Sequence, residues 1–156
     1  MLIMISNKHI TALKIICDKL SGIDWHLSGS TNLALQGVDV EPKDIDIRIK
    51  IEDIQAVQNA LQQYCMKKIE YSQSNGYSSF FGQFDIDGMQ LDVMAGTVEK
   101  DGVKIAVKDV KFCIVDVDGA EIPCLSLQTE YEAYSNMGRH EKAGLIKAAI
   151  DSDIKF

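Results

Sequence analysis

Between Asp44 and Ile49 the sequence alternates strictly between a charged residue and an isoleucine. Successive side chains of a β-strand point to opposite faces, so the isoleucines share one face and the charged residues share the other. The segment therefore predicts a strand whose isoleucines enter a hydrophobic core. The other face then carries Asp44 and Asp46 together, with backbones roughly 6 to 7 Å apart along the strand.

Hydrophobic patterns elsewhere predict an α+β fold in which helices flank a mixed β-sheet. A length of 156 residues is usual for one domain, and no repeat or Pro-rich linker divides the chain, so we expect a single domain over residues 1–156. Helices are expected at 8–20, 31–36, 51–65, 127–137 and 140–150, and strands at 25–27, 44–49, 68–72, 79–86, 89–94, 103–107, 111–117 and 120–125. The helix at 51–65 suggests a βαβ-like unit, while Asp87-Gly88 predicts a hairpin, which makes the sheet mixed.

The net charge of −7 limits the kinds of partner that the chain can bind. Proteins that bind a nucleic-acid backbone usually cluster Lys and Arg, so no stable nucleic-acid partner is expected. A triphosphate remains compatible with an acidic chain when divalent metal ions lie between carboxylates and phosphate oxygens. No apolar run approaches the roughly 20 residues that span a bilayer, so we expect no membrane contact and a cytoplasmic location.

Several other residue types are interpreted as structural. The four cysteines show no spacing typical of a zinc site and should be reduced and mostly buried; they are Cys17, Cys65, Cys113 and Cys124. Trp25 and Tyr64 are expected to pack in or beside the core, and His26 is left outside the site because a lone histidine beside a turn is usually structural. The aspartates before Gly88 and Gly119 should mark turns and solvent-facing positions.

Asp44 and Asp46 carry the strongest chemical signal in the sequence. Their side chains can reach a common divalent ion, or two ions roughly 3.5 to 4 Å apart as in two-metal sites. Oxygen ligands of this kind suit Mg²⁺ and phosphate, and a cation would relieve the repulsion between two like charges. The alternative is the solvated polar face of an amphipathic strand, which an isolated Asp-x-Asp more often represents.

A second signal is Ser28-Gly29-Ser30, which follows a short strand and precedes a helix. Glycine permits close backbone approach, and the free N–H groups at the start of a helix can bind an anion. Ser30 adds a hydroxyl donor. Read alone, the segment is more often an N-cap and turn than a phosphate-binding loop.

Both signals together resemble the signature of the DNA polymerase beta-like nucleotidyltransferase superfamily. The match consists of a hydrophobic-Ser-Gly-Ser segment ending at Ser30, a spacer of 13 residues, and Asp44-Ile45-Asp46-Ile47. That superfamily also requires a third carboxylate on a later strand, and Asp92 in Leu91-Asp92-Val93-Met94 supplies it after a hairpin that would bring it beside the first two. The resemblance implies a mixed-sheet nucleotidyltransferase fold with a short C-terminal helical segment.

Within the superfamily, the chain looks most like the minimal and lincosamide nucleotidyltransferase branch. The segment Ile122–Leu127 and the later Arg139 also match that branch, which often has a lysine followed by Arg-x-Lys-Asp in this helical region. Tyr134 stands where the lysine is expected, and His140-Glu141-Lys142 replaces the usual run. Arg139 and Lys142 are therefore the candidates for basic contacts to the phosphates.

The resemblance implies transfer of a nucleoside monophosphate, with AMP favoured, from an NTP such as ATP to an acceptor hydroxyl, while pyrophosphate leaves. Asp44, Asp46 and Asp92 would hold two Mg²⁺ ions, for which Mn²⁺ could substitute, and Asp92 or its metal would help to deprotonate the hydroxyl. Ser28, Gly29 and Ser30 would form the nucleotide-binding turn. The acceptor would be a small molecule or a protein.

The exact function and the role of the C-terminal helices stay open at the level of the sequence. The main rival is a catalytically inactive nucleotide-binding or partner-binding module of the same fold, and a third interpretation is a metal-dependent phosphohydrolase that releases phosphate. Tyr71–Phe81 and the C-terminal helices at 127–151 would form the acceptor pocket. Because the chain is short, those helices could instead complete the site of a second subunit in a homodimer.

Overall fold

The computed structural model describes residues 5–104, 107 and 109–154. The α-helices in this part of the chain are α1 (Asn7–Lys19), α2 (Gly29–Leu35), α3 (Ile54–Ala60), α4 (Leu127–Asn136) and α5 (His140–Ile154). The strands are β1 (Trp25–Ser28), β2 (Ile45–Ile49), β3 (Cys65–Ser74), β4 (Tyr77–Ile86), β5 (Met89–Lys100), β6 (Val103–Lys104), β7 (Phe112–Val117) and β8 (Ala120–Leu125). None of the described helices has the length and apolar character needed to cross a membrane.

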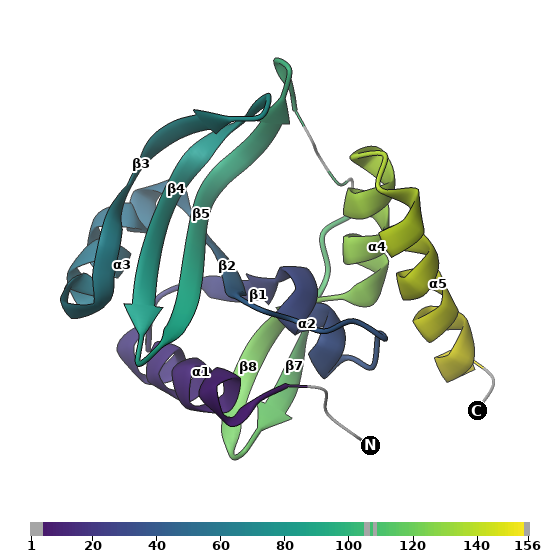
Figure 1. Cartoon of the computed structure of the whole chain (residues 1–156), viewed down its shortest axis with the longest axis horizontal. Helices are drawn as coiled ribbons and strands as arrows, with labels where there is room; N and C mark the ends of the chain where they lie inside the picture. Colours follow the sequence, from purple (N-terminus) through teal and green to yellow (C-terminus); the bar gives the residue numbers. More distant parts are fainter. Residues whose placement is uncertain (1–4, 105–106, 108, 155–156) are drawn as a thin grey trace.

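The strands form a single mixed sheet in the order β3-β4-β5-β2-β1-β8-β7, and β6 pairs with β5. The neighbours β2 and β5 run parallel, as do β1 and β8, while the other paired strands are antiparallel. This order places β2, the strand with the alternating sequence, at the centre of the sheet. In Figure 1 the long β3, β4 and β5 strands lie at one end of the molecule, and α4 and α5 lie at the other.

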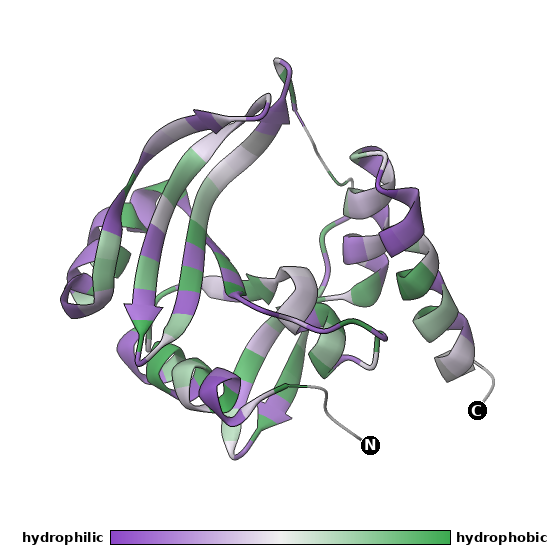
Figure 2. Cartoon of the chain, in the orientation of Figure 1, coloured by the Kyte–Doolittle hydropathy of each residue, from purple (hydrophilic) through white to green (hydrophobic). Residues whose placement is uncertain are grey.

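The main hydrophobic core lies where α1 and α3 cover one face of the sheet. Leu13 and Ile16 of α1 pack there with Ile45 and Ile47 of β2, and all four side chains are fully buried. Burial alternates along β2 as the sequence predicted, because its isoleucines face this core. Figure 2 shows hydrophobic and hydrophilic bands alternating along β4 and β5 as well. The opposite face of these strands is therefore free to carry polar groups.

A second, smaller core joins the other helices. Leu33 of α2 packs there against Tyr134 of α4 and Ile146 of α5, all of them buried. The C-terminal helices are thus attached to α2, the helix that follows the Ser28-Gly29-Ser30 segment. Hydrophobic contact thus helps to fix their position relative to that segment, although α2 and α4 are far apart in the sequence.

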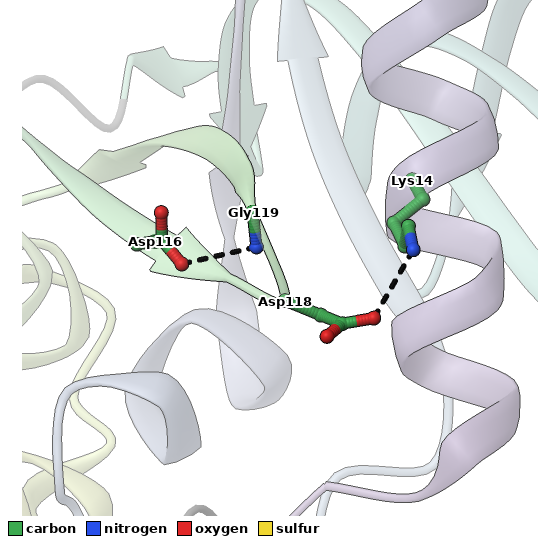
Figure 3. A network of polar contacts seen from close by, with 4 residues as sticks. All are labelled: Lys14, Asp116, Asp118 and Gly119. Atoms are coloured by element: carbon green, nitrogen blue, oxygen red, sulfur yellow. Dashed lines mark hydrogen bonds and ion pairs between the residues drawn. The ribbon is translucent and has the colours of Figure 1, made fainter.

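Short turns with left-handed backbone conformations join the antiparallel strands. At the β7–β8 turn, Asp118 has φ of 51° and Gly119 has φ of 88°, and the Asp116 carboxylate accepts a hydrogen bond from the Gly119 N–H at 3.1 Å. Figure 3 shows this turn next to α1, where Lys14 forms an ion pair with Asp118 at 3.1 Å. The interpretation of the Asp-Gly pairs as turns is confirmed.

The helix predicted at residues 51–65 is interrupted, which corrects the expectation of one continuous element. A 3₁₀ turn (Ile51–Asp53), α3 and a second 3₁₀ turn (Gln62–Tyr64) occupy the segment. The side chain of Gln58 accepts the Ile69 N–H at 2.9 Å and ties the helix to β3. Strands β2 and β3 run parallel, but β5 and β4 lie between them, so the expected βαβ-like unit does not join neighbouring strands.

Other bounds differ from the predictions by a few residues. Helix α2 begins at Gly29 and not at residue 31, because Ser28 is the extended N-cap residue. Asp44 precedes β2 and does not belong to it. Strands β3 and β4 are longer than expected, since the left-handed pair Asn75-Gly76 lets their pairing continue to the turn. Of the strand predicted at 103–107, residues 105 and 106 lie outside the described residues and Val107 is not in a strand.

Candidate active site

Strands β1, β2 and β5 place polar side chains in rows on the face of the sheet opposite the main core. In one row Ser28 of β1 pairs with Asp46 of β2, which in turn pairs with Asp92 of β5. The next row along β2 contains His26 and Arg48, which are also register partners. Residues two apart on a strand share a face, so the two rows form one polar surface. The sequence prediction that Asp92 lies beside Asp46 is confirmed by this register.

Neighbouring side chains hold the other two aspartates of the predicted cluster, Asp44 through its backbone and Asp92 through its carboxylate. The Thr31 hydroxyl of α2 donates a hydrogen bond to the backbone carbonyl of Asp44 at 2.8 Å, which holds the entry to β2. The side-chain amides of Gln83 and Gln90 both donate to Oδ1 of Asp92, at 3.3 and 2.9 Å. These contacts orient the Asp92 carboxylate and leave its second oxygen free of protein donors within the described residues.

Gly29 lies directly against Asp46. Its φ is +73°, and a Cβ atom built on Gly29 would lie 2.5 Å from Oδ2 of Asp46. Any side chain at this position would therefore collide with a carboxylate of the predicted cluster, in addition to straining a left-handed backbone. The glycine of the Ser-Gly-Ser segment is required by this close approach between α2 and β2.

Electrostatic repulsion is concentrated at Asp46. Burial, together with the nearby carboxylates of Asp92, Asp44 and Glu130, raises the pKa of Asp46 to about 7. Burial also raises the pKa of Asp92, although the hydrogen bonds from the Gln90 and Gln83 side-chain amides oppose this shift. Burial and the neighbouring carboxyl groups thus both disfavour the charged form of Asp46.

A buried glutamate of α4 connects the C-terminal region to the Ser-Gly-Ser segment. Oε2 of Glu130 accepts hydrogen bonds from the Gly29 N–H and from the Asn32 side-chain amide, both at 2.9 Å. The same amide also donates to the carbonyl of Leu125 at 2.8 Å. Glu130 is only 4% exposed, and burial raises its pKa to about 7 although these donors and Arg48 favour the charged form. The start of α2 is thus held by a carboxyl group from the far end of the chain.

The C-terminal helices bring basic side chains to the same place. Nζ of Lys142 in α5 donates a hydrogen bond to the Ser30 hydroxyl at 3.3 Å. The guanidinium of Arg139 lies 4.9 Å from the centre of the Tyr134 ring, and Lys142 lies 5.9 Å from it. The Tyr134 ring therefore packs against the two cations, although it stands at the position where a lysine was expected. Burial raises the pKa of Tyr134 to about 12.

A cleft of about 550 Å³ opens between this face of the sheet and α4. Four of the predicted site residues line it: Ser28, Gly29, Asp46 and Arg139. The other four lie next to these in the chain, in the sheet or by hydrogen bond: Asp44, Asp92, Ser30 and Lys142. The structure therefore places the predicted residues in the lining of the cleft or next to it.

The walls of the cleft come partly from the region predicted to bind the acceptor. Tyr77 and Ser79 of β4 lie on one side, and Tyr134 and Met137 of α4 lie on the other. Tyr71, the first residue of the predicted region, is instead exposed and contacts the Phe80 ring edge-on at 5.7 Å. Of the segment predicted to contact the acceptor, Tyr77 and Ser79 line the cleft.

Sequence reasoning missed three residues that line the cleft: His26, Arg48 and Glu130. Arg48 and His26 could have been found, because each stands two residues from a predicted site residue on the same strand and so shares its face. His26 is half-buried, contacts the Phe112 ring, and has its pKa lowered to about 4 by burial and by Arg48. No local signal marks Glu130, whose role depends on the packing of α4 against α2.

The donor chemistry of the carboxylates fits a divalent cation. Asp44, Asp46 and Asp92 offer oxygen ligands, and a bound cation would favour the charged form of Asp46, which burial and the neighbouring carboxylates disfavour. Among the residues that the structure describes, no three His, Cys, Asp or Glu side chains are grouped closely enough to hold a metal ion. A metal would therefore draw these carboxylates together by rotation of their side chains.

Comparison with solved structures defines the class of protein. The Thermotoga maritima protein TM1012, described as a candidate nucleotidyltransferase, is 34% identical, with a TM-score of 0.74 over 96% of each chain. The crystal structure of ANT(2'')-Ia with adenylyl-2''-tobramycin has a TM-score of 0.51 at 12% identity, over 94% of this chain and 99% of that one. The solution structure of the antibiotic-resistance factor ANT(2'')-Ia gives 0.56 at 13% identity, over 97% and 95%. At these low identities ANT(2'')-Ia shows the fold alone, and the fold is that of a nucleotidyltransferase.

The sequence assigns the chain more narrowly within that class. The model of the aminoglycoside-2''-adenylyltransferase family matches residues 12–146. The chain belongs to this family, and its general activity is nucleotidyl transfer. None of the curated proteins with which the sequence was compared matches it.

Proposed function

We propose that the protein transfers AMP from ATP to a hydroxyl group of an acceptor in a Mg²⁺-dependent reaction. The acceptor oxygen would attack the α-phosphorus, the bond between that phosphorus and the β-phosphate oxygen would break, and pyrophosphate would leave with the electron pair. The hydroxyl proton would pass to Asp92, whose free oxygen faces no protein donor among the described residues. The acceptor would be a small molecule or a protein side chain.

The observation that carries this proposal is the row formed by Ser28, Asp46 and Asp92 in register across three strands. The backbone of Gly29 lies directly against the Asp46 side chain. Phosphate groups bound at the start of α2 would therefore lie beside the carboxylates. Phosphoryl-type displacement depends mainly on such positioning and on charge neutralisation. The solvated-face interpretation of the two aspartates does not account for a third carboxylate in the same row.

The remaining predicted residues would bind the nucleotide. Ser30 presents its hydroxyl at the first turn of α2, and Lys142 already contacts that hydroxyl, so both would meet the terminal phosphates. Arg139 lines the cleft on the side of α4. When bound, Mg²⁺ held by Asp44, Asp46 and Asp92 would neutralise the triphosphate and lower the pKa of the attacking hydroxyl.

The decisive experiment is calorimetric binding of a non-hydrolysable ATP analogue with and without Mg²⁺. The variant Asp44→Asn with Asp46→Asn should lose Mg²⁺-dependent binding. A matched control, Asp18→Asn with Asp151→Asn, removes the same charge at two exposed positions and should bind as the wild type does. Equal binding by all three proteins would reject the assignment of the carboxylates.

Product analysis then separates the proposed reaction from its rivals. Release of pyrophosphate from ATP, together with transfer of label from the α-phosphate to an acceptor, supports adenylyl transfer. Release of inorganic phosphate would indicate the phosphohydrolase instead. Mg²⁺-dependent binding without turnover over a broad acceptor panel would favour the inactive binding module.

Three further expectations remain part of the proposal. The single nucleotidyltransferase domain would act in the cytoplasm, where the four cysteines would stay reduced. The helices α4 and α5 would serve as the acceptor-binding wall, or as the element through which two subunits complete each other's sites. A size measurement that shows a strict monomer with full activity would remove the second role.

A further inference from the structure

Arg48 lines the cleft one row beyond Asp46 and its side chain is half-buried. Its guanidinium makes one hydrogen bond to the described residues, to the Gly96 carbonyl at a long 3.4 Å. The ion pairs among those residues involve lysines alone, so no described carboxylate lies within 4.0 Å of Arg48. A guanidinium carries five N–H donors, and most of those of Arg48 have no protein acceptor in the described part of the chain.

An unpaired cation in such a position is costly for the fold. Removing a charge from water costs several kcal/mol unless an opposite charge or hydrogen-bond acceptors replace the solvent. Its neighbour His26 cannot supply the missing negative charge, because imidazole is neutral or positive. Groups kept in this state inside a cleft are commonly kept for a ligand.

The charged residues around the cleft show which ligand this would be. The chain contains two arginines, Arg48 and Arg139, and both line the cleft. The carboxylates in the described lining are Asp46, which lies in the row assigned to metal binding, and Glu130, whose Oε2 is occupied by Gly29 and an asparagine amide. Glu130 offsets part of the charge of Arg48, but it lies beyond ion-pair distance, so most of the guanidinium donors of Arg48 remain open to an anionic ligand.

We propose that Arg48 is the centre of an anion-binding subsite, which takes a carboxylate or phosphate group of the acceptor molecule. This inference rests on the proposed adenylyl transfer and names the class of its acceptor. Arginine matches both anions in a bidentate manner.

The geometry also sets the size of the acceptor. Rows on a strand are roughly 6 to 7 Å apart, so an anion on Arg48 would lie about that far from the hydroxyl that reacts beside Asp46. A phosphorylated sugar or a hydroxy acid of similar length spans this distance. Met94, the register partner of Arg48 on β5, also lines the cleft there and offers apolar contact to the part of the molecule between the two groups.

Inorganic phosphate is a suitable first probe, because it tests the subsite without knowledge of the whole acceptor. The protein is saturated with Mg²⁺ and a non-hydrolysable ATP analogue, which fills the triphosphate position, and phosphate is then titrated while the arginine Nε–H resonances are followed by NMR. With two arginines in the chain, the resonance of Arg48 is assigned by its loss in Arg48→Gln. We expect a saturable shift of this resonance.

Matched variants connect the binding to Arg48. Arg48→Gln should weaken phosphate binding about ten- to hundredfold, the effect of losing a charge-assisted bidentate contact, and Arg48→Lys should weaken it less. Lys50→Gln is the control, because Lys50 has the same charge near the end of the same strand but is exposed and paired with Asp24 at 3.0 Å. Glucose 6-phosphate should bind the same complex more tightly than glucose or glucosamine.

Three results would overturn the inference: no phosphate-dependent shift at Arg48, equal phosphate binding by Arg48→Gln and Lys50→Gln, or tighter binding of glucosamine than of glucose 6-phosphate. If Arg48→Gln fails to fold, the comparison of Arg48→Lys with Lys50→Gln decides the question. Failure of the ATP analogue to bind would reject the proposed function. In that case, titration of phosphate into the protein without the analogue, followed at the Arg48 resonance, would still test the subsite separately.

Discussion

The buried carboxyl group of Glu130 gives a sharp test of how α4 holds the start of α2. We compare two substitutions, Glu130→Gln and Glu130→Ala. The glutamine keeps an oxygen that can accept from the Gly29 N–H and the Asn32 amide, while it removes the ionisable proton. The alanine removes both the charge and the acceptor, so the two variants separate electrostatics from hydrogen bonding.

The magnitude for glutamine follows from the shift in pKa. The pKa of Glu130 rises from 4.5 to about 7 on folding, so between these values the folded state keeps a proton that the unfolded state has released. Stability is thus fully present below pH 4.5 and is lost as the pH rises through 7. At about 1.4 kcal/mol for each pKa unit, the loss between pH 4 and pH 8 is about 3 kcal/mol. The Glu130→Gln variant escapes this loss.

The magnitude for alanine follows from the hydrogen bonds. The Gly29 N–H and one Asn32 N–H lose their acceptor inside a site where Glu130 is only 4% exposed. Each buried donor left without an acceptor costs roughly 1 to 3 kcal/mol. We expect Glu130→Ala to unfold about 2 to 5 kcal/mol more easily than Glu130→Gln at any pH.

The assay is urea unfolding at pH 5 and pH 8 for the wild type and each variant. Relative to the wild type, Glu130→Gln should gain about 2 to 3 kcal/mol in unfolding free energy between the two pH values. Glu132→Gln on the same helix is the control, since its carboxylate has only a long contact with Gln128 at 3.5 Å among the contacts described. Glu130 also contributes to the shift at Asp46, so the difference between Glu130→Gln and this control measures Glu130 together with its coupling to Asp46.

Two results would refute this reasoning. A Glu130→Gln stability that stays parallel to the wild type over this pH range would show that Glu130 does not titrate near pH 7. Equal stability of the glutamine and alanine variants would show that the hydrogen bonds to α2 contribute little.

The remaining predictions concern glycines and a histidine. Gly29→Ala should abolish binding of the ATP analogue and destabilise the fold more than Gly22→Ala, because both have positive φ but only Gly29 would meet Asp46; equal melting and binding of the two variants would contradict this. The pKa of His26 is lowered to about 4, so the folded state takes up its proton less readily and stability falls from pH 6.5 to 4; His26→Gln should reduce this acid loss by about 3 kcal/mol in unfolding titrations, and an unchanged dependence of stability on pH below 6.5 would count against it. Gly144→Ala, on an open face of α5, should raise unfolding free energy by about 0.5 to 1 kcal/mol, and a lower melting temperature would disprove it.

Local patterns predicted most of the secondary structure and the acidic cluster. The alternation around Asp46 was enough to predict which face of β2 is buried, because strand periodicity is a local property of the chain. The helix at 51–65 was not predicted correctly, since Gln58 bonds to the backbone of β3 and the chain turns for reasons outside its own sequence window. Element bounds near Gly29 and Asp44 differed for a similar reason.

The sequence alone determined the residue types and spacing of the Ser-Gly-Ser and Asp-x-Asp segments, and with them the class of chemistry. Only the tertiary structure decided that Glu130 holds Gly29, that Lys142 reaches Ser30, and that Arg48 faces a cleft without an ion-pair partner among the described residues. The first two contacts join positions about a hundred residues apart. The surroundings of Arg48 depend on a cleft that several helices and strands line together. Periodicity fixes the face on which a side chain lies, whereas its partners are set by the packing of elements that no local pattern contains.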